Sequence, residues 1–341
     1  MHSRVAIVYN KPVPSHYDLR GEGKAVTSVL DSVEAVHKAL AESGYDVVRV
    51  PLTLPLEQAR EELKSLAVDL VFNLFEGFAG YPETEVLVPE MAAELGIPCT
   101  GCSAATLTLA LDKAKTKAIL EESGIATPRY QVLSPETLST FRLNYPCIVK
   151  PCSEDASHGL SEESVVYEFT SLERQVKLIS DFYSGGVLVE EFIDGQEFNA
   201  TVLGKSECTT LPISEITYSL PPGMPRILTF AAKWEPDSLY FQGTKPICPA
   251  QIPDSQRENI AEMALAVFRL FCSCGYARVD MRFDREGKLN VMEVNPNPDI
   301  SPGTGAARQA EAAGMSYTEF IAMIVSLAME KNRQCQPRFA R

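Results

Sequence analysis

The sequence predicts an α/β fold of two or three domains, and three observations support this prediction. At 341 residues, the chain is too long for one typical hydrophobic core. Its first hundred residues alternate short apolar runs with helical patterns, an order that implies a parallel sheet with crossover helices. Near the C-terminus, two alternating strands flank a tight turn, which is typical of an antiparallel hairpin.

The composition is that of an ordinary globular protein. Hydrophobic residues make up 45% of the chain and charged residues 22%. No apolar run approaches the roughly 20 residues that cross a bilayer, so we expect no membrane partner. Nine cysteines without a secretory signal indicate a reducing cytoplasm. The net charge of −14 argues against nucleic acid as a partner.

The N-terminal third alternates strands and helices. We expect strands at 5–8, 45–50 and 70–73, and helices at 29–40, 56–66 and 86–95. Binding loops of parallel sheets lie at the carboxyl ends of the strands. Segments 73–77 and 98–102 fall at those ends and are therefore candidates for a site.

Shorter elements follow in the rest of the chain. The expected strands are 147–150, 187–192 and 198–203, and the expected helices are 171–179, 255–271 and 318–329. Segment 152–159 is small and polar, the composition of a mobile loop. Segment 217–253 reads as irregular, a capping box at 255–258 opens the next helix, and the tail 331–341 is expected to be loose.

The C-terminal hairpin carries the clearest chemistry. Alternation places Arg278 and Asp280 on one face of its first strand, and Glu293 and Asn295 on one face of its second. A two-residue turn at Glu286–Gly287 would set Asp280 opposite Glu293, with Cβ atoms about 5 Å apart. Two carboxylates and an amide oxygen suit Mg²⁺, which prefers oxygen ligands. The alternative is a solvated sheet face with alternating charges.

Two lysines are candidates for a phosphate site, because the familiar glycine-rich nucleotide motifs are absent. Lys113 begins a lysine cluster, and Lys150 ends a strand immediately before the small, polar loop. Glu190 and Glu191 end another strand, and Glu197 follows closely. An acid beside a backbone amide can bind an adenine or a ribose. The alternative for each of these residues is a solvated charge at a strand end.

Taken together, these segments resemble the ATP-grasp superfamily, and most closely its D-alanine–D-alanine ligase branch. The resemblance spans residues 5–329. It rests on LGIP with TG at 95–101, LDK with TK at 111–117, IVKP at 148–151, ARVD at 277–280 and MEVN at 292–295. It implies an N-terminal α/β domain, a central lid domain and a C-terminal catalytic domain with a mixed sheet. The implied boundaries are 1–105, 106–188 and 189–330, followed by the tail.

The resemblance also implies roles for individual residues. The ATP-binding set would be Lys113, Lys150, Glu190, Glu191, Phe192, Ile193 and Glu197. Two Mg²⁺ ions, for which Mn²⁺ can substitute, would be held by Asp280, Glu293 and Asn295. The catalytic candidates are Arg278 for the tetrahedral intermediate, Lys233 for the γ-phosphate and Ser157 in the central loop, where residues 153–159 would close over the phosphates.

The implied reaction joins a carboxylate to an amine. The carboxylate attacks the γ-phosphorus of ATP to give an acyl phosphate and ADP, and the amine then displaces phosphate. Catalysis of this kind depends on positioning, charge neutralisation and exclusion of water. The implied partners are small amino-acid or peptide substrates and a second copy of the chain in a homodimer.

The part that would bind amino acids departs from the family pattern. Ala156 replaces the first of two serines, Trp234 replaces a tyrosine after the catalytic lysine, and Glu76 replaces a histidine. Thr304 begins the pair that replaces Ser-Leu, and Asp299 stands where glycine is usual. Because a site discriminates through such contacts, we expect substrates other than two D-alanines. The alternatives are D-alanyl-D-alanine itself as product, phosphoryl transfer alone, and a non-catalytic ATP-binding module.

Overall fold

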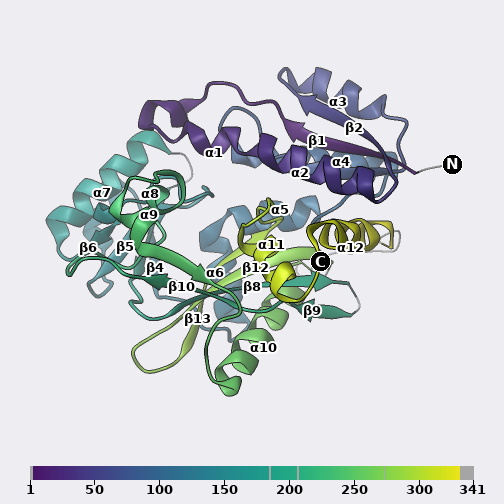
Figure 1. Cartoon of the computed structure of the whole chain (residues 1–341). Coiled ribbons are helices and arrows are strands. Elements are labelled where there is room, and N and C mark those ends of the chain that lie inside the picture. The colour runs from purple at the N-terminus through teal and green to yellow at the C-terminus, as the bar shows by residue number, and fades with distance from the viewer. Residues whose placement is uncertain (1–2, 184–185, 206, 273, 331–341) are drawn as a thin grey trace.

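Three β-sheets organise the computed structural model, which describes residues 3–183, 186–205, 207–272 and 274–330 (Figure 1). The expected tail at 331–341 lies outside the described residues. One sheet is parallel and the other two are antiparallel. The predicted α/β fold class is therefore confirmed, whereas the C-terminal sheet, which was expected to be mixed, is antiparallel in all its described pairings.

Parallel strands form the N-terminal sheet, as the alternating pattern predicts. Its order is β2-β1-β3, with β1 at Arg4–Asn10, β2 at Asp46–Leu52 and β3 at Leu70–Leu74. Successive residues of a strand point to opposite faces. Val5 and Ile7 of β1 accordingly pack in the core that contains α2 (Val29–Glu42). The alternate residues of β1 pack in a second core with α3 (Leu56–Lys64) and α4 (Leu87–Leu95).

Further short helices lie between these elements and after them. They are η1 (His16–Arg20), α1 (Gly23–Thr27), η2 (Pro82–Val86), α5 (Ala104–Leu111) and α6 (Lys113–Glu122). Asp112 caps α6, since its carboxylate accepts a hydrogen bond from the backbone N–H of Lys115 at 2.9 Å. This cap fixes where α6 begins and therefore where the Lys113 side chain emerges.

The central sheet is antiparallel, in the order β4-β7-β5-β6. Its strands are β4 at Tyr130–Leu133, β5 at Cys147–Pro151, β6 at Val165–Val166 and β7 at Val187–Glu191. Helix α7 (Phe169–Phe182) packs on it through buried aliphatic residues, and η3 (Pro135–Thr140) and η4 (Glu162–Ser164) are peripheral. The domain boundaries stay a prediction, and the one expected after residue 188 falls inside β7.

The C-terminal sheet has the order β11-β10-β8-β12-β13, and β9 pairs with β8. Its strands are β8 at Glu197–Gly204, β9 at Cys208–Thr210, β10 at Ser214–Tyr218, β11 at Thr244–Ile247, β12 at Gly275–Phe283 and β13 at Leu289–Pro296. Val279 and Met281 face a core with α10 (Asp254–Phe271), which leaves Arg278 and Asp280 on the opposite face, as alternation predicts.

Two expectations for the C-terminal part were wrong, and one helix was not expected. The stretch 217–253 contains helices α8 (Phe230–Trp234) and α9 (Leu239–Gly243) as well as β11, and each is only five residues or fewer. Helix α10 starts at Asp254, so Ser255 lies inside its first turn and forms no capping box. Helix α11 (Gly305–Ala312) was not expected, while α12 (Tyr317–Met329) begins with a capping box.

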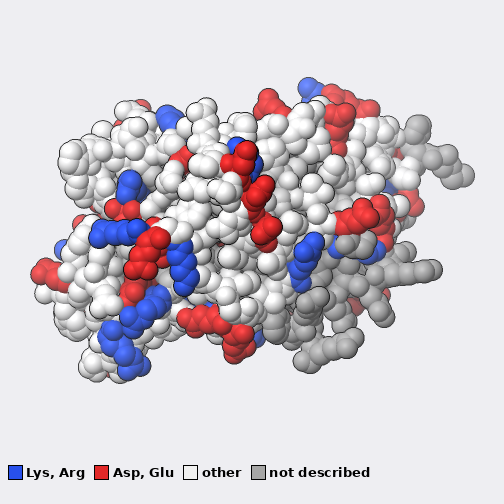
Figure 2. Space-filling model, turned by 90° about the horizontal axis from the view of Figure 1, so that it is seen from below, with Lys and Arg blue, Asp and Glu red and all other residues white. Residues whose placement is uncertain are grey.

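No single helix in the described ranges is long and apolar enough to cross a membrane; α11 and α12, which meet at 107°, reach that length and composition only when taken together. Several residues of α12 are buried in the core that it shares with α2 and β1. Acidic and basic side chains are intermixed on the face of the molecule seen in Figure 2.

Candidate active site

The hairpin β12–β13 brings the predicted metal ligands together. Asp280 pairs with Glu293 and Arg278 with Asn295, as predicted. The predicted two-residue turn is wrong, however, because the Asp284 N–H donates to the Lys288 carbonyl at 2.9 Å. A β-bulge between Asp280 and Met281 shifts the register by one residue and offsets this difference.

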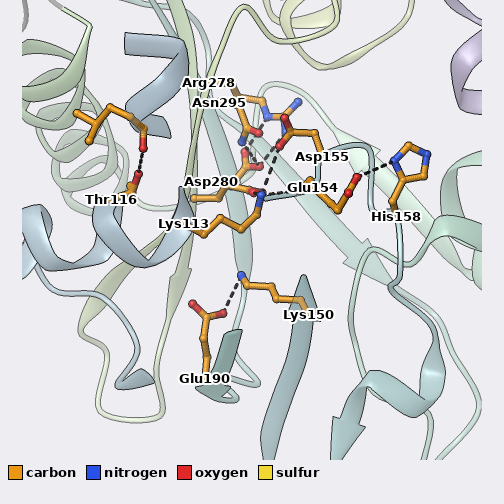
Figure 3. Close-up of polar contacts among 12 residues, drawn as sticks. Lys113, Thr116, Lys150, Glu154, Asp155, His158, Glu190, Arg278, Asp280 and Asn295 are labelled. Atoms are coloured by element: carbon orange, nitrogen blue, oxygen red, sulfur yellow. Dashed lines mark hydrogen bonds and ion pairs between the residues drawn. The ribbon is translucent and has the colours of Figure 1, made fainter. Parts of the chain in front are cut away.

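Arg278 and Asn295 both contact the carboxylate of Asp280 (Figure 3). The guanidinium donates from Nε to Oδ1 at 2.7 Å and from Nη2 to Oδ2 at 2.8 Å, and Asn295 Nδ2 donates to Oδ2 at 3.0 Å. The two oxygens thus receive three donors. A bidentate arginine of this kind fixes the carboxylate in one orientation.

Lys113 pairs with the second acid of the hairpin. Its Nζ lies 2.9 Å from Glu293 Oε1, 2.5 Å from the Glu154 carbonyl oxygen and 3.4 Å from Asp155 Oδ1. Although burial favours the neutral forms, the mutual attraction raises the pKa of Lys113 and holds the pKa of Glu293 below its usual value. Both groups are therefore charged at neutral pH.

A second cluster surrounds Glu190, which is fully buried. Lys150 Nζ lies 2.7 Å from Glu190 Oε2, and Lys117 pairs with the other oxygen. Lys117 also donates to Thr127 Oγ1 at 2.7 Å. Lys117 was not expected to have a role in the site. Its spacing from Lys113 could have indicated one, since residues four apart lie on one helix face.

The predicted adenine and ribose residues lie near the end of β7. The Phe192 N–H donates to Pro146, and the Ile193 carbonyl accepts from Arg282 Nη1 at 2.8 Å. Glu197 accepts from Arg282 and from the hydroxyl of Tyr218. The Glu191 side chain takes no part in these contacts with Arg282.

The side chain of Glu191 forms hydrogen bonds at the end of β7. Its Oε1 accepts from Arg129 Nη1 at 3.0 Å and from Asn144 Nδ2 at 2.9 Å. Arg282 was missed by the sequence analysis, which selected only Arg278 from the two arginines of β12. In the folded chain, Arg282 lies 5.5 Å from the ring centre of Phe192 and connects it to Glu197.

The remaining catalytic candidates lie on or beside α8. Burial, together with the Arg278 cation, lowers the pKa of Lys233. Glu293 and Asp280 act in the opposite direction, because their negative charges favour the charged amine. Ser157 Oγ donates to the Leu228 carbonyl at 2.9 Å, so this hydroxyl joins the central loop to the segment before α8.

Two predicted substrate residues accompany Lys233 and Ser157. Ala156 and Ser157 adopt φ values of 52° and 63°, in the left-handed region. Trp234 follows Lys233 and lies 6.2 Å from the ring of Phe230.

The other predicted substrate residues lie in acidic surroundings. Asp299 Oδ1 accepts from the Ser301 N–H at 2.8 Å, and Thr304 Oγ1 donates to the Ser301 carbonyl at 2.8 Å, so both stabilise their own turn. Although Glu76 reaches solvent, the surrounding protein, Asp299 and Asp155 raise its pKa to about 8. Burial, Asp155 and Glu76 also raise the pKa of Glu85, which the sequence analysis missed.

The hairpin residues offer a donor set for a hard cation. Among the described residues, no three or more His, Cys, Asp and Glu side chains are grouped as a metal site. Asp280, Glu293 and Asn295 supply two carboxylates and one amide oxygen beside two phosphate-binding candidates. Mg²⁺ is typically held by one or two carboxylates together with water and substrate phosphate, so this set fits it.

Comparisons with known proteins define the family of this chain. Residues 119–326 match the family described as D-ala D-ala ligase C-terminus. The D-alanine–D-alanine ligase of Pelotomaculum thermopropionicum is 30% identical over 313 residues, which cover 88% of this chain and 92% of that protein. The chain therefore belongs to the D-alanine–D-alanine ligase family of ATP-grasp ligases, which confirms the resemblance.

Other relatives extend this comparison. An uncharacterized protein of Sinorhizobium fredii is 37% identical over 263 residues, which cover 76% of this chain and 74% of that protein. The solved D-alanine–D-alanine ligase of Bacillus anthracis has a TM-score of 0.74 at 23% identity, covering 97% of this chain and 98% of that one. The VanG D-Ala:D-Ser ligase of Enterococcus faecalis has a TM-score of 0.73 at 19% identity, covering 96% of this chain and 100% of that one. These structures share the fold of nearly the whole chain.

Proposed function

We propose that this protein is an ATP-dependent, ADP-forming ligase that joins a carboxylate to an amine through an acyl phosphate. Its substrates are amino acids or a peptide other than two D-alanines. The observation that carries the proposal is the 2.9 Å contact between Lys113 and Glu293, which joins a phosphate-binding candidate to a metal-binding candidate. Membership of the D-alanine–D-alanine ligase family supports the use of ATP.

The roles follow from charge and position. Lys113 and Lys150 bind the phosphates of ATP, and Glu190, Phe192, Ile193 and Glu197 surround its adenosine. Asp280, Glu293 and Asn295 hold Mg²⁺, which Mn²⁺ can replace and which neutralises phosphate charge when bound. Arg278 stabilises negative charge on the tetrahedral intermediate, and Lys233 assists at the γ-phosphate.

The reaction proceeds in two balanced steps. A carboxylate oxygen of the first substrate attacks the γ-phosphorus, the bond from phosphorus to the ADP oxygen breaks, and ADP leaves. The amine of the second substrate then attacks the acyl carbon, the bond from carbon to the phosphate oxygen breaks, and phosphate leaves with one oxygen of the original carboxylate. The amine loses a proton to solvent or phosphate. Positioning and fixed charges account for catalysis of this type.

The substitutions around the amino-acid site support altered substrates. Ala156 and Trp234 lack the hydroxyls of the residues that they replace, and a site that hydrogen-bonds its substrate discriminates through such groups. Glu76 and Asp299 add acidic groups relative to the family pattern, which favour an amine-rich or cationic substrate. Because the pKa of Glu76 is about 8, its carboxylate forms as the pH rises through that value. Affinity for a cationic substrate is expected to increase over the same range.

A substrate panel tests the proposal. The purified protein is incubated with ATP, Mg²⁺ and pairs of amino acids or dipeptides, and ADP and product mass are measured. We expect one ADP for each amide formed, and one ¹⁸O atom in phosphate when the substrate carboxylate carries ¹⁸O. A stable phosphorylated product would instead indicate phosphoryl transfer alone. No ADP release with any pair would contradict a ligase.

The second candidate function is synthesis of D-alanyl-D-alanine, because the Pelotomaculum relative carries the name D-alanine–D-alanine ligase. Rapid ADP release with D-alanine alone would establish this candidate and exclude the altered substrates. Family membership favours either ligase over a non-catalytic ATP-binding module. The homodimer and the cytoplasmic location remain proposals.

A further inference from the structure

Three aromatic side chains from separate parts of the chain form one stack beside the candidate phosphate site. Tyr17 of η1 lies 3.9 Å from His158 between ring centres, with an interplanar angle of 11°. His158 lies 5.9 Å from Phe230 of α8, at 23°. The three side chains are buried. The stack therefore joins the N-terminal part, the loop 153–159 and the segment around α8.

A hydrogen bond connects the stack to Lys113. Tyr17 Oη donates to Glu154 Oε2 at 2.6 Å, and the backbone carbonyl of Glu154 accepts from Lys113 Nζ at 2.5 Å. Figure 3 shows Glu154 and His158 on the same side of Lys113, with Asp155 between them and the hairpin. Tyr17 and the lysine proposed to bind phosphate thus contact the same residue, Glu154.

Further bonds hold the same loop from both sides. Glu22 accepts from the Gly159 N–H at 3.3 Å and from Tyr183 Oη at 2.8 Å. On the other side, the Phe230 N–H donates to the Leu160 carbonyl at 3.1 Å. The loop is therefore fixed by side chains from outside the central sheet.

We propose that Tyr17, Glu154 and His158 are positioning residues that hold the loop 153–159 over the acyl phosphate and exclude water. This proposal rests on the proposed ligase function. When the loop opens, a water oxygen attacks the acyl carbon, the bond from carbon to the phosphate oxygen breaks, and the products are phosphate and the original carboxylate. One proton of the water goes to phosphate and the other to solvent, which leaves the carboxylate ionised. ATP is then consumed without amide formation.

Two variants separate the effect of the Tyr17–Glu154 hydrogen bond from that of the aromatic stack. Tyr17→Phe keeps the ring on His158 and removes the hydrogen bond to Glu154, whereas His158→Ala removes the stack. In His158→Ala, we expect the ratio of ADP to amide to rise from one in the parent protein to about three. We also expect the backbone amides of His158 and Gly159 to exchange hydrogen about tenfold faster in the free protein, while amides of β12 keep their rates. Tyr17→Phe is expected to show both effects at smaller size.

Tyr145→Phe is the matched control, because Tyr145 forms a different aromatic pair with Phe141 at 5.2 Å. It is expected to match the parent protein in both measurements. If ADP and amide fall together at a constant ratio and loop exchange is unchanged in both variants, the positioning role is refuted. If the parent forms no amide with any substrate pair, the ligase function fails. Unchanged loop exchange in the variants would then also refute the positioning role, whereas faster exchange would show that these residues still hold the loop.

Discussion

Individual charged residues in the hairpin already have partners of opposite sign. Asp280 binds Arg278, and Glu293 binds Lys113. These cations are the groups that the proposed function assigns to the intermediate and to phosphate. Binding of ATP and Mg²⁺ would therefore replace these ionic contacts within the protein by contacts with phosphate and metal. Such preorganised charges stabilise a transition state with little rearrangement.

Asp280→Asn and Glu293→Gln are each expected to lower turnover by about 100-fold or more, because each removes a carboxylate that would hold the metal. ADP release at saturating substrate measures the loss, and circular dichroism checks that the fold is retained. Glu286→Gln, in the exposed turn of the same hairpin, is the control and should keep full activity. Full turnover in Asp280→Asn would show that the metal assignment is wrong.

Glu190 forms a buried triad with Lys117 and Lys150, and removing the acid is expected to destabilise the protein more than removing one lysine. Burial lowers the pKa values of Lys117 and Lys150, and the Glu190 carboxylate is the anion that pairs with both amines. Glu190→Gln leaves these two buried amines without that anion, which is expected to cost about 3 kcal/mol. Lys117→Met leaves one balanced pair and is expected to cost only about 1 kcal/mol. Urea denaturation measures both. Equal losses would contradict the view that Glu190 neutralises two lysines.

Glu154 predicts a pH dependence of stability. Burial, with Asp155, raises its pKa from 4.5 to about 7, although the hydrogen bond from Tyr17 acts in the opposite direction. Between these values the unfolded chain has released the proton that the folded chain keeps, so the free energy of unfolding falls as the pH rises. Relative to the parent, Glu154→Gln should gain stability across this range, by up to about 3 kcal/mol above pH 7. A difference that is independent of pH would contradict this assignment.

At the scale of elements, local patterns predicted the longer helices and most of the longer strands, but not the details of their ends. The short strands β4, β6, β9, β10 and β11 were not expected. Alternation identified both strands of the hairpin because it repeats over several residues. The bulge at Asp280 has no such repeat, and the correct pairing with Glu293 followed from two differences that offset each other. Helices α8 and α9 have five residues each, too short for a 3.6-residue period to be recognised.

Two glycines near the hairpin test its packing. A Cβ on Gly195 would lie 1.6 Å from the Phe283 carbonyl oxygen, so Gly195→Ala is expected to destabilise the protein by more than about 2 kcal/mol. Gly287 has open space around it but a φ of 80°, so Gly287→Ala is expected to cost about 1 kcal/mol. Chemical denaturation compares them. A smaller loss for Gly195→Ala would contradict the close approach of this backbone to β12.

At the scale of the whole molecule, the candidate site draws residues from α6 and from the central and C-terminal sheets. Lys113 comes from α6, Lys150 and Glu190 from the central sheet, and Asp280 and Glu293 from the C-terminal sheet. The family motifs selected all of these residues except Glu190, which was selected because it ends an expected strand. The contacts of Lys117, Arg282 and the aromatic stack were not predictable, because they depend on how segments far apart in sequence approach one another.

Product analysis with the substrate panel tests the central claim most directly. ADP and product mass are measured together, with ¹⁸O in the substrate carboxylate. The proposed ligase predicts one ADP and one amide for each turnover with at least one amino-acid or peptide pair, a slower reaction with D-alanine alone, and ¹⁸O in the released phosphate. ADP release without any amide, or amide formation without ¹⁸O in phosphate, would contradict ligation through an acyl phosphate.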